Sequence, residues 1–278
     1  MPRPGPSPVL LIVLAIASVQ IGASVAKGLY DQASPLAVAW VRMLGASVVL
    51  TLLARPRLGG RRGADWGWVL AYGVAMAGMN VAFYLSMERI PVGMAVTLEF
   101  LGPLGVAVAS SRRARDLVWV GLAASGVALL GFTPGRLDPV GVALALLAGA
   151  IWAAYIVLAG PVGRAWDGVT GVTVACVTGA AVLTPPVLLL GQAPGPVAGV
   201  WALGLLVGLL SSVVPYGLEM IALRRIDRGV FGILMSLEPA AAALAALVLL
   251  GEQLRPIEVV AMGCVILASV GVVRTTSR

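Results

Sequence analysis

Two stretches of this sequence decide its fold: residues 89–103, RIPVGMAVTLEFLGP, and residues 225–239, RIDRGVFGILMSLEP. Aligned without a gap, they share an initial Arg-Ile and end on superposed prolines, and the segments on either side correspond roughly. Each stretch carries one glutamate, Glu99 or Glu238, about halfway along some twenty otherwise apolar residues. A carboxylate at such a depth in hydrocarbon is costly, so it indicates a functional site. The pair predicts a chain of two related halves with a polar site between them.

The composition indicates that the solvent of this chain is a lipid bilayer. Of its 278 residues, 60% are hydrophobic and only 11% are charged, and the mean hydropathy is +1.01. A water-exposed globule of this size needs more charge on its surface. The net charge of +7 does not predict a nucleic-acid partner, because the arginines occur in short clusters between apolar runs.

The sequence offers few ligands for a metal or a cofactor. It contains no histidine, and its two cysteines, Cys176 and Cys264, stand inside apolar segments. Neither a zinc site nor a disulfide framework is expected from these residues. We therefore expect no metal and no cofactor beyond a driving ion.

Ten apolar runs are long enough to cross a bilayer as helices, which predicts an all-α membrane protein. Their connections are short, which leaves no room for a water-soluble domain between two spans. The first run could be read as a cleavable signal peptide, but Gln20, Ser24 and Lys27 continue it as a polar stripe at helical spacing, so we expect it to remain. The predicted spans are 8–27, 35–54, 66–87, 91–110, 117–133, 138–160, 168–191, 198–221, 229–250 and 256–273.

The basic residues predict the orientation, because arginine and lysine concentrate in cytoplasmic loops. The even-numbered connections carry Arg55, Arg57, Arg61, Arg62, Arg112, Arg113, Arg115, Arg164, Arg224, Arg225 and Arg228. The odd-numbered connections carry only Lys27, Arg89, Arg136 and Arg255. With Arg3, Arg274 and Arg278 near the ends, the pattern places both termini in the cytoplasm and supports the count of ten spans.

The repeat divides the chain into two five-helix halves, residues 1–134 and 135–278. Because five is odd, the second half would enter the membrane from the opposite side. Inverted repeats of this kind let secondary transporters alternate their access around a site at the bilayer midplane.

The two superposed prolines, Pro103 and Pro239, are candidate hinges, since a proline within a helix removes one backbone hydrogen bond. A glutamate stands near each of them. An ionised glutamate at the bilayer centre costs about 2.5–3.5 kcal/mol, and neutralising it at pH 7 costs about 3.7 kcal/mol. These costs nearly cancel, so either glutamate could serve as a proton-coupling or substrate-contacting group. The structural alternative is a fixed ion pair, for instance with Arg42.

Further polar stripes predict the lining of a central cavity. Asn80 and Tyr84 are one turn apart, and Trp152 and Tyr155 form a second stripe. A third stripe combines Ser212, Tyr216 and Glu219, and Glu219 could instead pair with Arg224 or Arg225. For each of these side chains, hydrogen bonding between packed helices is the alternative. The candidate site therefore comprises Glu99, Glu238, Asn80, Tyr84, Gln20, Ser24, Lys27, Arg42, Trp152, Tyr155, Tyr216 and Glu219.

Several strings resemble the EamA-type drug/metabolite transporter superfamily and, within it, the bacterial threonine/homoserine exporter subgroup. They are Gly22-Ala-Ser-Val-Ala-Lys27, Gly78-Met-Asn-Val-Ala-Phe-Tyr-Leu-Ser86, Leu98-Glu-Phe-Leu-Gly-Pro103, Ser110-Ser-Arg-Arg113, Pro215-Tyr-Gly-Leu-Glu-Met-Ile-Ala-Leu-Arg224 and Ser236-Leu-Glu-Pro239. The resemblance extends from about residue 10 to residue 273. It implies a ten-helix inner-membrane exporter of amino acids or related metabolites that is driven by the proton gradient.

A zwitterionic amino acid needs a cationic partner for its carboxylate and an anionic partner for its ammonium. Lys27 or Arg42, together with Glu99 or Glu238, could supply them. The alternatives are efflux of cationic drugs, a passive channel, and an intramembrane enzyme. For an enzyme, the loops offer only isolated Asp65, Asp116, Asp167 and Asp227. We expect a transporter without catalytic residues, and the sequence leaves its oligomeric state open.

Overall fold

The computed structural model describes residues 7–56, 58–110, 117–131, 137–167, 169–223, 225–226 and 228–276. Their regular structure is helical throughout, as the sequence predicted, and contains one short π-helical segment. The elements are α1 (Pro8–Lys27), α2 (Pro35–Ala54), α3 (Gly63–Met87), α4 (Val92–Glu99), α5 (Leu101–Ser110), α6 (Leu117–Gly131), α7 (Pro139–Ala165), α8 (Thr170–Leu189), α9 (Ala198–Gly208), η2 (Leu209–Val213), α10 (Val214–Leu223), α11 (Arg228–Met235), α12 (Glu238–Leu250) and α13 (Pro256–Thr276). The predicted boundary between the halves, at residues 134 and 135, lies outside the described residues.

The described residues form nine segments that are long and apolar enough to cross a membrane. The remaining predicted span, 117–133, corresponds to α6, which is apolar but shorter. Three spans are interrupted: α4 with α5, α9 with α10, and α11 with α12 each make up one crossing. The chain is therefore a multi-pass membrane protein.

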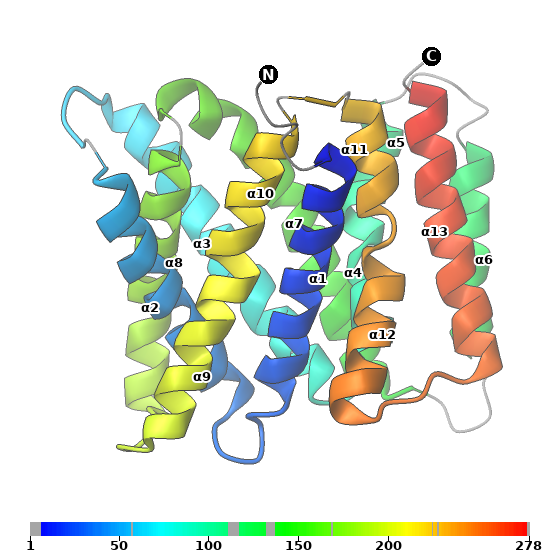
Figure 1. The fold of residues 1–278 in the computed structure, drawn as a ribbon, viewed down its shortest axis with the longest axis horizontal. Coiled ribbons are helices and arrows are strands. Elements are labelled where there is room, and N and C mark those ends of the chain that lie inside the picture. Colours follow the sequence, from blue (N-terminus) through cyan, green and yellow to red (C-terminus); the bar gives the residue numbers. More distant parts are fainter. Residues whose placement is uncertain are drawn as a thin grey trace, which may run out of the picture.

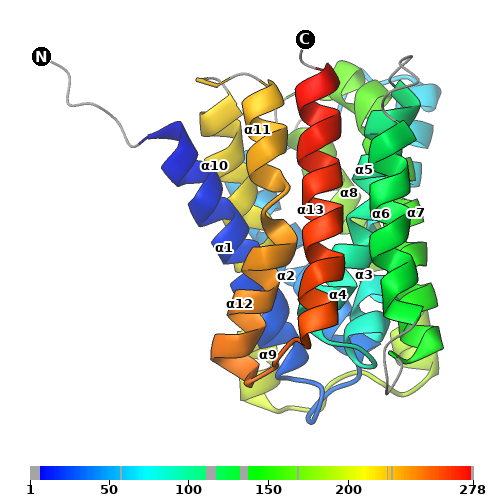
Figure 2. The ribbon, with the colours of Figure 1, turned by 90° about the vertical axis from the view of Figure 1, so that its right-hand side faces the viewer.

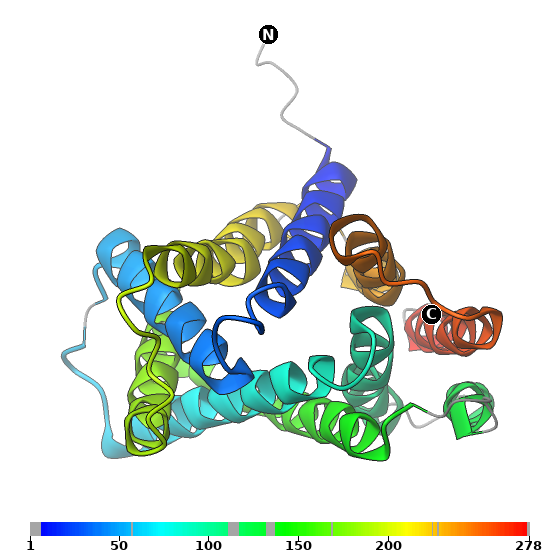
Figure 3. The ribbon, with the colours of Figure 1, turned by 90° about the horizontal axis from the view of Figure 1, so that it is seen from below.

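The helices stand roughly side by side in one bundle, and α1 begins at the same end of the bundle at which α13 finishes (Figures 1 and 2). Below, we call this the terminal end and the other the distal end. Seen from the distal end, α1, α2, α3, α4, α10 and α12 surround the middle of the bundle (Figure 3). The pair α6 and α13 lies at one edge (Figures 1 and 3).

The contacts between helices relate the first half of the chain to the second. Helix α1 packs against α10, and α3 packs against α7; α2 packs against α8, α4 against α12, and α6 against α13. Numbered as spans, these pairs are 1 with 8, 3 with 6, 2 with 7, 4 with 9, and 5 with 10. If each span is replaced by the equivalent span of the other half, 1 by 6, 2 by 7 and so on, the same set of pairs results. The two halves therefore contact each other reciprocally.

The fourth and ninth spans are broken beside their glutamates. Helix α4 ends at Glu99, and α12 begins at Glu238. Pro103 and Pro239 both lie in the first turn of the following helix, where the missing N–H disturbs no intrahelical bond. The prolines therefore begin the second half of each span instead of kinking a continuous helix.

Capping residues fix where the helices start at the distal end. The Ser34 hydroxyl accepts a bond from the Ala37 N–H at 3.2 Å, and the Asp138 carboxylate accepts bonds from the Val140 and Gly141 N–H groups at 2.7 and 3.0 Å. The Gly141 N–H, together with that of Val140 and the Arg89 guanidinium, holds the pKa of Asp138 below its ordinary value of 3.8. These caps set the register of α2 and α7, two of the helices that line the site described next.

Candidate functional site

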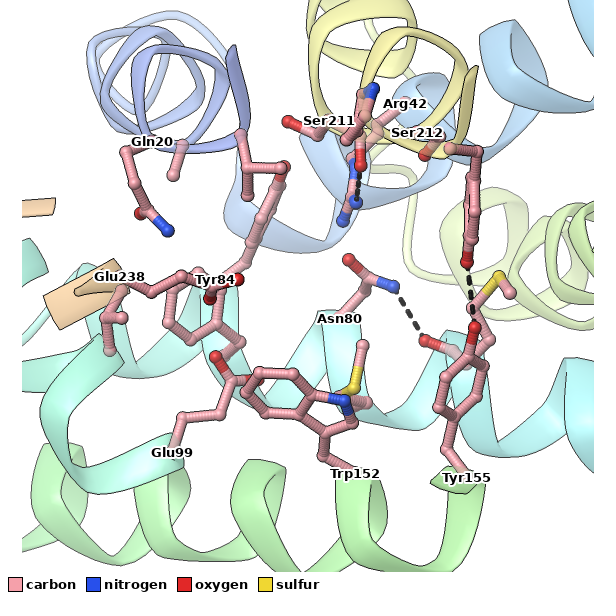
Figure 4. Close-up of a pocket in the computed structure, with 18 of the residues that line it drawn as sticks. Gln20, Arg42, Asn80, Tyr84, Glu99, Trp152, Tyr155, Ser211, Ser212 and Glu238 are labelled. Atoms are coloured by element: carbon pink, nitrogen blue, oxygen red, sulfur yellow. Dashed lines mark hydrogen bonds between the residues drawn. The ribbon is translucent and has the colours of Figure 1, made fainter. Parts of the chain in front are cut away.

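A cavity of about 260 Å³ lies in the middle of the bundle, and side chains from both halves of the chain line it (Figure 4). Three of them are carboxylates and one is a guanidinium, and most of the remainder are apolar or aromatic. The lining residues are Val19, Gln20, Ala23, Arg42, Met43, Met76, Met79, Asn80, Phe83, Tyr84, Val96, Glu99, Trp152, Tyr155, Ser211, Ser212, Pro215, Tyr216, Glu219, Met235 and Glu238.

The two midspan glutamates are nearly buried, each with 7% of its surface exposed. Their positions on the helices differ: Glu99 is the last residue of α4, whereas Glu238 is the first residue of α12. The helix macrodipole therefore favours negative charge at Glu238 and disfavours it at Glu99. The backbone of Glu99 is also fixed by close packing, because a Cβ added to Gly149 of α7 would lie 2.6 Å from the Glu99 carbonyl oxygen.

Arg42 supplies the guanidinium of the cavity. Its Nη2 donates to the Ser211 carbonyl at 3.2 Å, and the guanidinium carbon lies 5.8 Å from the centre of the Tyr84 ring. Helix α9 approaches closely here, since a Cβ at Gly208 would lie 2.6 Å from the Arg42 carbonyl oxygen. Figure 4 shows Arg42 on one side of the view and Glu99 with Glu238 on the other.

The Ser211 carbonyl is available to Arg42 because the backbone is locally π-helical. In η2 the α-helical bonding pattern is interrupted, and two successive carbonyls accept side-chain donors: Leu210 from the Ser18 hydroxyl at 2.6 Å and Ser211 from Arg42. π-Helical turns often occur at functional sites. This segment joins α1 and α2 of the first half to the eighth span.

Several buried polar atoms of this region have no hydrogen-bond partner among the described residues. Four of them belong to cavity-lining residues, and the hydroxyl of nearby Ser24 is a fifth. Buried polar atoms are normally satisfied, so such a group of exceptions indicates surfaces that face a polar ligand or water. The four lining atoms are Gln20 Oε1, Arg42 Nε, Tyr84 Oη and Ser211 Oγ.

Aromatic side chains make up another part of the wall. The hydroxyls of Tyr155 and Tyr216 are hydrogen-bonded at 2.8 Å, and the Tyr155 ring stacks on Tyr72 with centroids 4.2 Å apart. Trp152 packs edge-on against Phe100, with centroids 5.8 Å apart. Between these rings and Arg42, Asn80 donates to the Met76 carbonyl at 2.7 Å (Figure 4).

At the distal end, a group of polar contacts joins three segments that follow or precede the lining helices. Lys27, the last residue of α1, lies 2.5 Å from a carboxylate oxygen of Glu252 and donates to the Ile90 carbonyl at 3.0 Å. The other Glu252 oxygen accepts from the Val92 N–H at 2.8 Å. We call these four residues the distal clasp. Near these contacts in the sequence, Met87 and Met94 are fully buried, and neither of them lines the cavity.

At the terminal end the cavity reaches Glu219, which is only half-buried and lies one turn before the end of α10. A different set of contacts joins the helices farther out. Arg61 pairs with Asp167 at 2.9 Å, and the Trp166 indole N–H donates to the Asp65 carbonyl at 3.2 Å.

Of the twelve side chains that the sequence singled out, ten line this one cavity. The other two, Ser24 and Lys27, do not: Ser24 is buried in α1, and Lys27 belongs to the distal clasp. Neither glutamate forms an ion pair with Arg42 within the described part of the chain, where the ion pairs join Lys27 with Glu252, Arg61 with Asp167, and Arg89 with Asp138. Of the two arginines named as alternative partners of Glu219, Arg224 lies outside the described residues, and Arg225 forms no ion pair with Glu219 within the described part of the chain.

Sequence reasoning missed several lining residues. Met43, Met79, Phe83 and Met235 are apolar, and in an apolar helix nothing distinguishes a cavity face from a packing face. Ser211 could have been noticed, because it is polar and adjacent to Ser212.

Comparison with known proteins agrees with this architecture. The EamA-like transporter family matches the chain twice, over residues 6–133 and 139–274. The threonine/homoserine exporter RhtA of Escherichia coli (strain K12) is 42% identical over 278 residues, which cover 98% of this chain and 92% of that protein. The threonine/homoserine exporter RhtA of Salmonella typhimurium (strain LT2) is 40% identical over 279 residues, with the same coverage.

A solved crystal structure that shares 18% sequence identity with the chain superposes with a TM-score of 0.66, covering 98% of this chain and 97% of the other. At that identity the likeness concerns the fold alone. The sequence relatives are exporters by name, and they match the chain over nearly its full length. With its bundle of membrane-spanning helices and its twofold match, the chain belongs to the EamA-like transporter family.

Proposed function

We propose that this protein exports small amino acids of the threonine and homoserine type across a bacterial inner membrane. The observation that carries the proposal is the cavity, in which Arg42 lies across from Glu99 and Glu238 in a chain 42% identical to a threonine/homoserine exporter. A zwitterion matches this pattern, with its carboxylate toward Arg42 and its ammonium toward the glutamates. Its hydroxyl would find partners at Asn80 and Gln20.

The two glutamates have different roles in this proposal. Glu238, at the N-terminus of α12, is the anionic partner of the substrate ammonium, because the helix macrodipole supports its negative charge. Glu99, at the C-terminus of α4, carries the coupling proton, because the macrodipole there opposes a negative charge. Glu219 lies on the terminal side of both and gives the proton a route to water.

The halves are proposed to form an inverted repeat with both termini in the cytoplasm. The reciprocal pairing of spans supports this, since 1 with 8 and 3 with 6 exchange under a twofold operation while the other pairs map onto themselves. Figure 1 supports it as well, because α1 runs away from the terminal end while α7 runs toward it. The arginine clusters at the terminal end agree with the cytoplasmic orientation. The cavity then opens toward the cytoplasm while the distal clasp closes the outer face.

Transport of labelled homoserine in proteoliposomes, with and without a pH gradient, tests the function. We expect Glu238→Gln to raise the KM for homoserine at least about tenfold, since a charge-assisted hydrogen bond contributes about 1.5–3 kcal/mol. Glu99→Gln should retain homoserine exchange but lose its response to the pH gradient. Glu88→Gln, an exposed glutamate at the distal end, is the matched control. If both cavity variants insert normally into the membrane and transport homoserine with wild-type kinetics, the proposed roles are refuted.

Efflux of cationic drugs is the second candidate, because three carboxylates face only one guanidinium in the cavity. Arg42→Gln separates the two functions. A cation exporter would keep its activity in this variant, whereas an amino-acid exporter would lose affinity for the substrate carboxylate.

A further inference from the structure

A second hollow lies on the outside of the bundle, between α2, α3 and α8 near the terminal end. Its volume is about 610 Å³, more than twice that of the central cavity. Among the described residues, it shares no lining residue with that cavity, and none of the side chains that line it is charged. These described side chains offer no partner for either charge of an amino acid and favour an apolar ligand instead.

The hollow is a groove that faces the hydrocarbon of the membrane. Its rims include Leu70, Val177 and Val182, which are 45%, 47% and 42% exposed, and its floor includes the buried Thr173 and Val174. From Thr173 to Val182 the groove follows α8 for about 13 Å, close to the ~15 Å hydrocarbon depth of one leaflet. Its length and lining suit a single extended acyl chain.

Two exposed arginines stand at the mouth of this groove. The Arg55 N–H donates to the carbonyl of Thr51, and the Trp66 N–H donates to the carbonyl of Arg62. Thr51 and Trp66 both line the groove, so each arginine is one helical turn from its wall. Trp66 itself is of the type that lies at the headgroup level of a bilayer.

The wall beside these arginines is held in place by other side chains. The Trp66 ring packs edge-on against Trp166 with centroids 5.1 Å apart, and the Arg61 guanidinium lies 5.1 Å from the Trp166 ring centre. Arg61 also pairs with Asp167 and donates to the Ala165 carbonyl. Arg61 is thus occupied by structural contacts, whereas Arg55 and Arg62 are exposed to the membrane surface.

We propose that this groove binds one anionic phospholipid of the leaflet on the terminal side, with an acyl chain along α8 and the phosphate between Arg55 and Arg62. An apolar groove alone gives little preference in a bilayer, because the surrounding lipid tails are as apolar as the groove. The selectivity comes from the arginines, each of which favours an anionic headgroup about fivefold. Asp65 accepts from the Arg62 backbone N–H, and within the described part of the chain no carboxylate pairs with the guanidinium of Arg55 or Arg62, which leaves both to the lipid.

Native mass spectrometry of the purified full-length protein, with dioleoyl phosphatidylglycerol or dioleoyl phosphatidylcholine added, tests the proposal. The wild type should retain one phosphatidylglycerol, with a preference of about 25-fold over phosphatidylcholine. Arg55→Gln/Arg62→Gln should reduce that preference to near one. Ala181→Phe, which places a ring in the groove, should reduce retention of both lipids.

Two variants serve as matched controls. Arg274→Gln removes an exposed arginine from the same end, and Ala154→Phe adds a ring to an exposed face of α7; both should retain phosphatidylglycerol as the wild type does. Three results would each overturn the proposal. They are equal retention of the two lipids by the wild type, undiminished retention in Ala181→Phe, and a groove occupied by a second copy of the chain. If Ala181→Phe fails to fold, the double arginine variant still decides the outcome.

Discussion

Arg42 holds the position in the cavity on which recognition of an amino acid depends. Its Nη2 is engaged with the Ser211 carbonyl, whereas its Nε is buried without a partner among the described residues. A guanidinium with an unused donor can bind a substrate carboxylate without first breaking an ion pair. The guanidinium also lies 5.8 Å from the centre of the Tyr84 ring. The Tyr84 hydroxyl has no hydrogen-bond partner among the described residues, so it could bind the substrate beside Arg42.

Replacing Arg42 by glutamine should raise the KM for homoserine by about tenfold or more, since a charge-assisted hydrogen bond contributes about 1.5–3 kcal/mol. Arg42→Lys should recover part of the loss, because lysine keeps the charge without the planar geometry. Kinetics in proteoliposomes measure the effect, with Arg274→Gln, which removes an exposed arginine outside the cavity, as a matched control. An unchanged KM in Arg42→Gln would remove Arg42 from the substrate site.

Gly149 controls the position of Glu99 although it touches only the backbone. An added Cβ would meet the Glu99 carbonyl oxygen at 2.6 Å, and backbone atoms cannot move aside as a flexible side chain can. We expect Gly149→Ala to destabilise the fold by about 1–3 kcal/mol and to reduce transport. Gly163→Ala on the same helix is the matched control, because nothing lies within 4 Å of its added Cβ. Thermal unfolding in detergent compares them, and equal midpoints would contradict the prediction.

Asp138 links a capping interaction to pH. Folding lowers its pKa below the ordinary value of 3.8, so its ionised form stabilises the fold above that value. The contribution is lost as the pH falls through the folded-state pKa. Asp138→Asn should therefore melt below the wild type at pH 7, and the difference should shrink as the pH approaches 3. Asp31→Asn, an exposed aspartate at the same end, is the control; a difference that does not vary with pH would count against the capping charge.

At the scale of whole elements, the distal clasp connects the end of α1 to the segments that precede α4 and follow α12. Besides the ion pair, each of the two charged side chains makes one hydrogen bond to the backbone. Lys27 donates to the Ile90 carbonyl, and Glu252 accepts from the Val92 N–H. Helix α4 ends at Glu99 and α12 begins at Glu238, and both glutamates line the cavity. A change at the clasp can therefore reach the site through two short rigid helices.

Lys27→Met should open the distal end. In a background of Cys176→Ala and Cys264→Ala, a cysteine at the buried Ser24 should react with an impermeant maleimide about tenfold faster when Lys27 is replaced, because about 1.4 kcal/mol of closure is lost. Arg89→Met is the matched control, since it breaks the exposed ion pair with Asp138 at the same end. Equal labelling rates in both variants would show that the clasp does not close this end.

Exchanging the clasp charges should not repair it. A glutamate at position 27 would face the Ile90 carbonyl, and a lysine at position 252 would face the Val92 N–H, so both backbone bonds would be lost. The variant Lys27→Glu/Glu252→Lys should therefore label like Lys27→Met. Labelling at the wild-type rate would mean that charge alone, without the backbone bonds, holds the end closed.

At the scale of the whole molecule, the proposed inverted repeat predicts that the two ends open in alternation. If they do, Lys27→Met should slow the labelling of a cysteine at Ser212, which lines the cavity nearer the terminal end, while it speeds labelling at Ser24. A passive channel would show faster labelling at Ser24 with no loss at Ser212. Asp31→Cys, exposed in the connection between α1 and α2, reports any general change in reactivity.

Much of this arrangement could be predicted because lipid constrains sequence strongly. Apolar runs located the spans, and a polar residue in such a run is conspicuous, so Glu99, Glu238 and Arg42 were visible at once. Irregular backbone segments, and ion pairs between residues far apart in the sequence, have no comparable pattern in the sequence. The π-helical turn has no composition of its own, and the partner of Lys27 lies more than two hundred residues away at Glu252. Lys27 was consequently assigned to the cavity stripe, although it points to the clasp.

The π-helical segment η2 has one more consequence, which concerns helical phase. A π turn accommodates an additional residue, and each residue advances an α-helix by about 100°. The stretch beyond it, which includes Tyr216 and Glu219, is thus rotated relative to α9 by roughly that angle. Without the additional residue, both side chains would be turned by about 100° from the direction in which they now line the cavity. One inserted residue in the eighth span, with no counterpart in the continuous α3, is enough to make the two related halves of this protein chemically unequal.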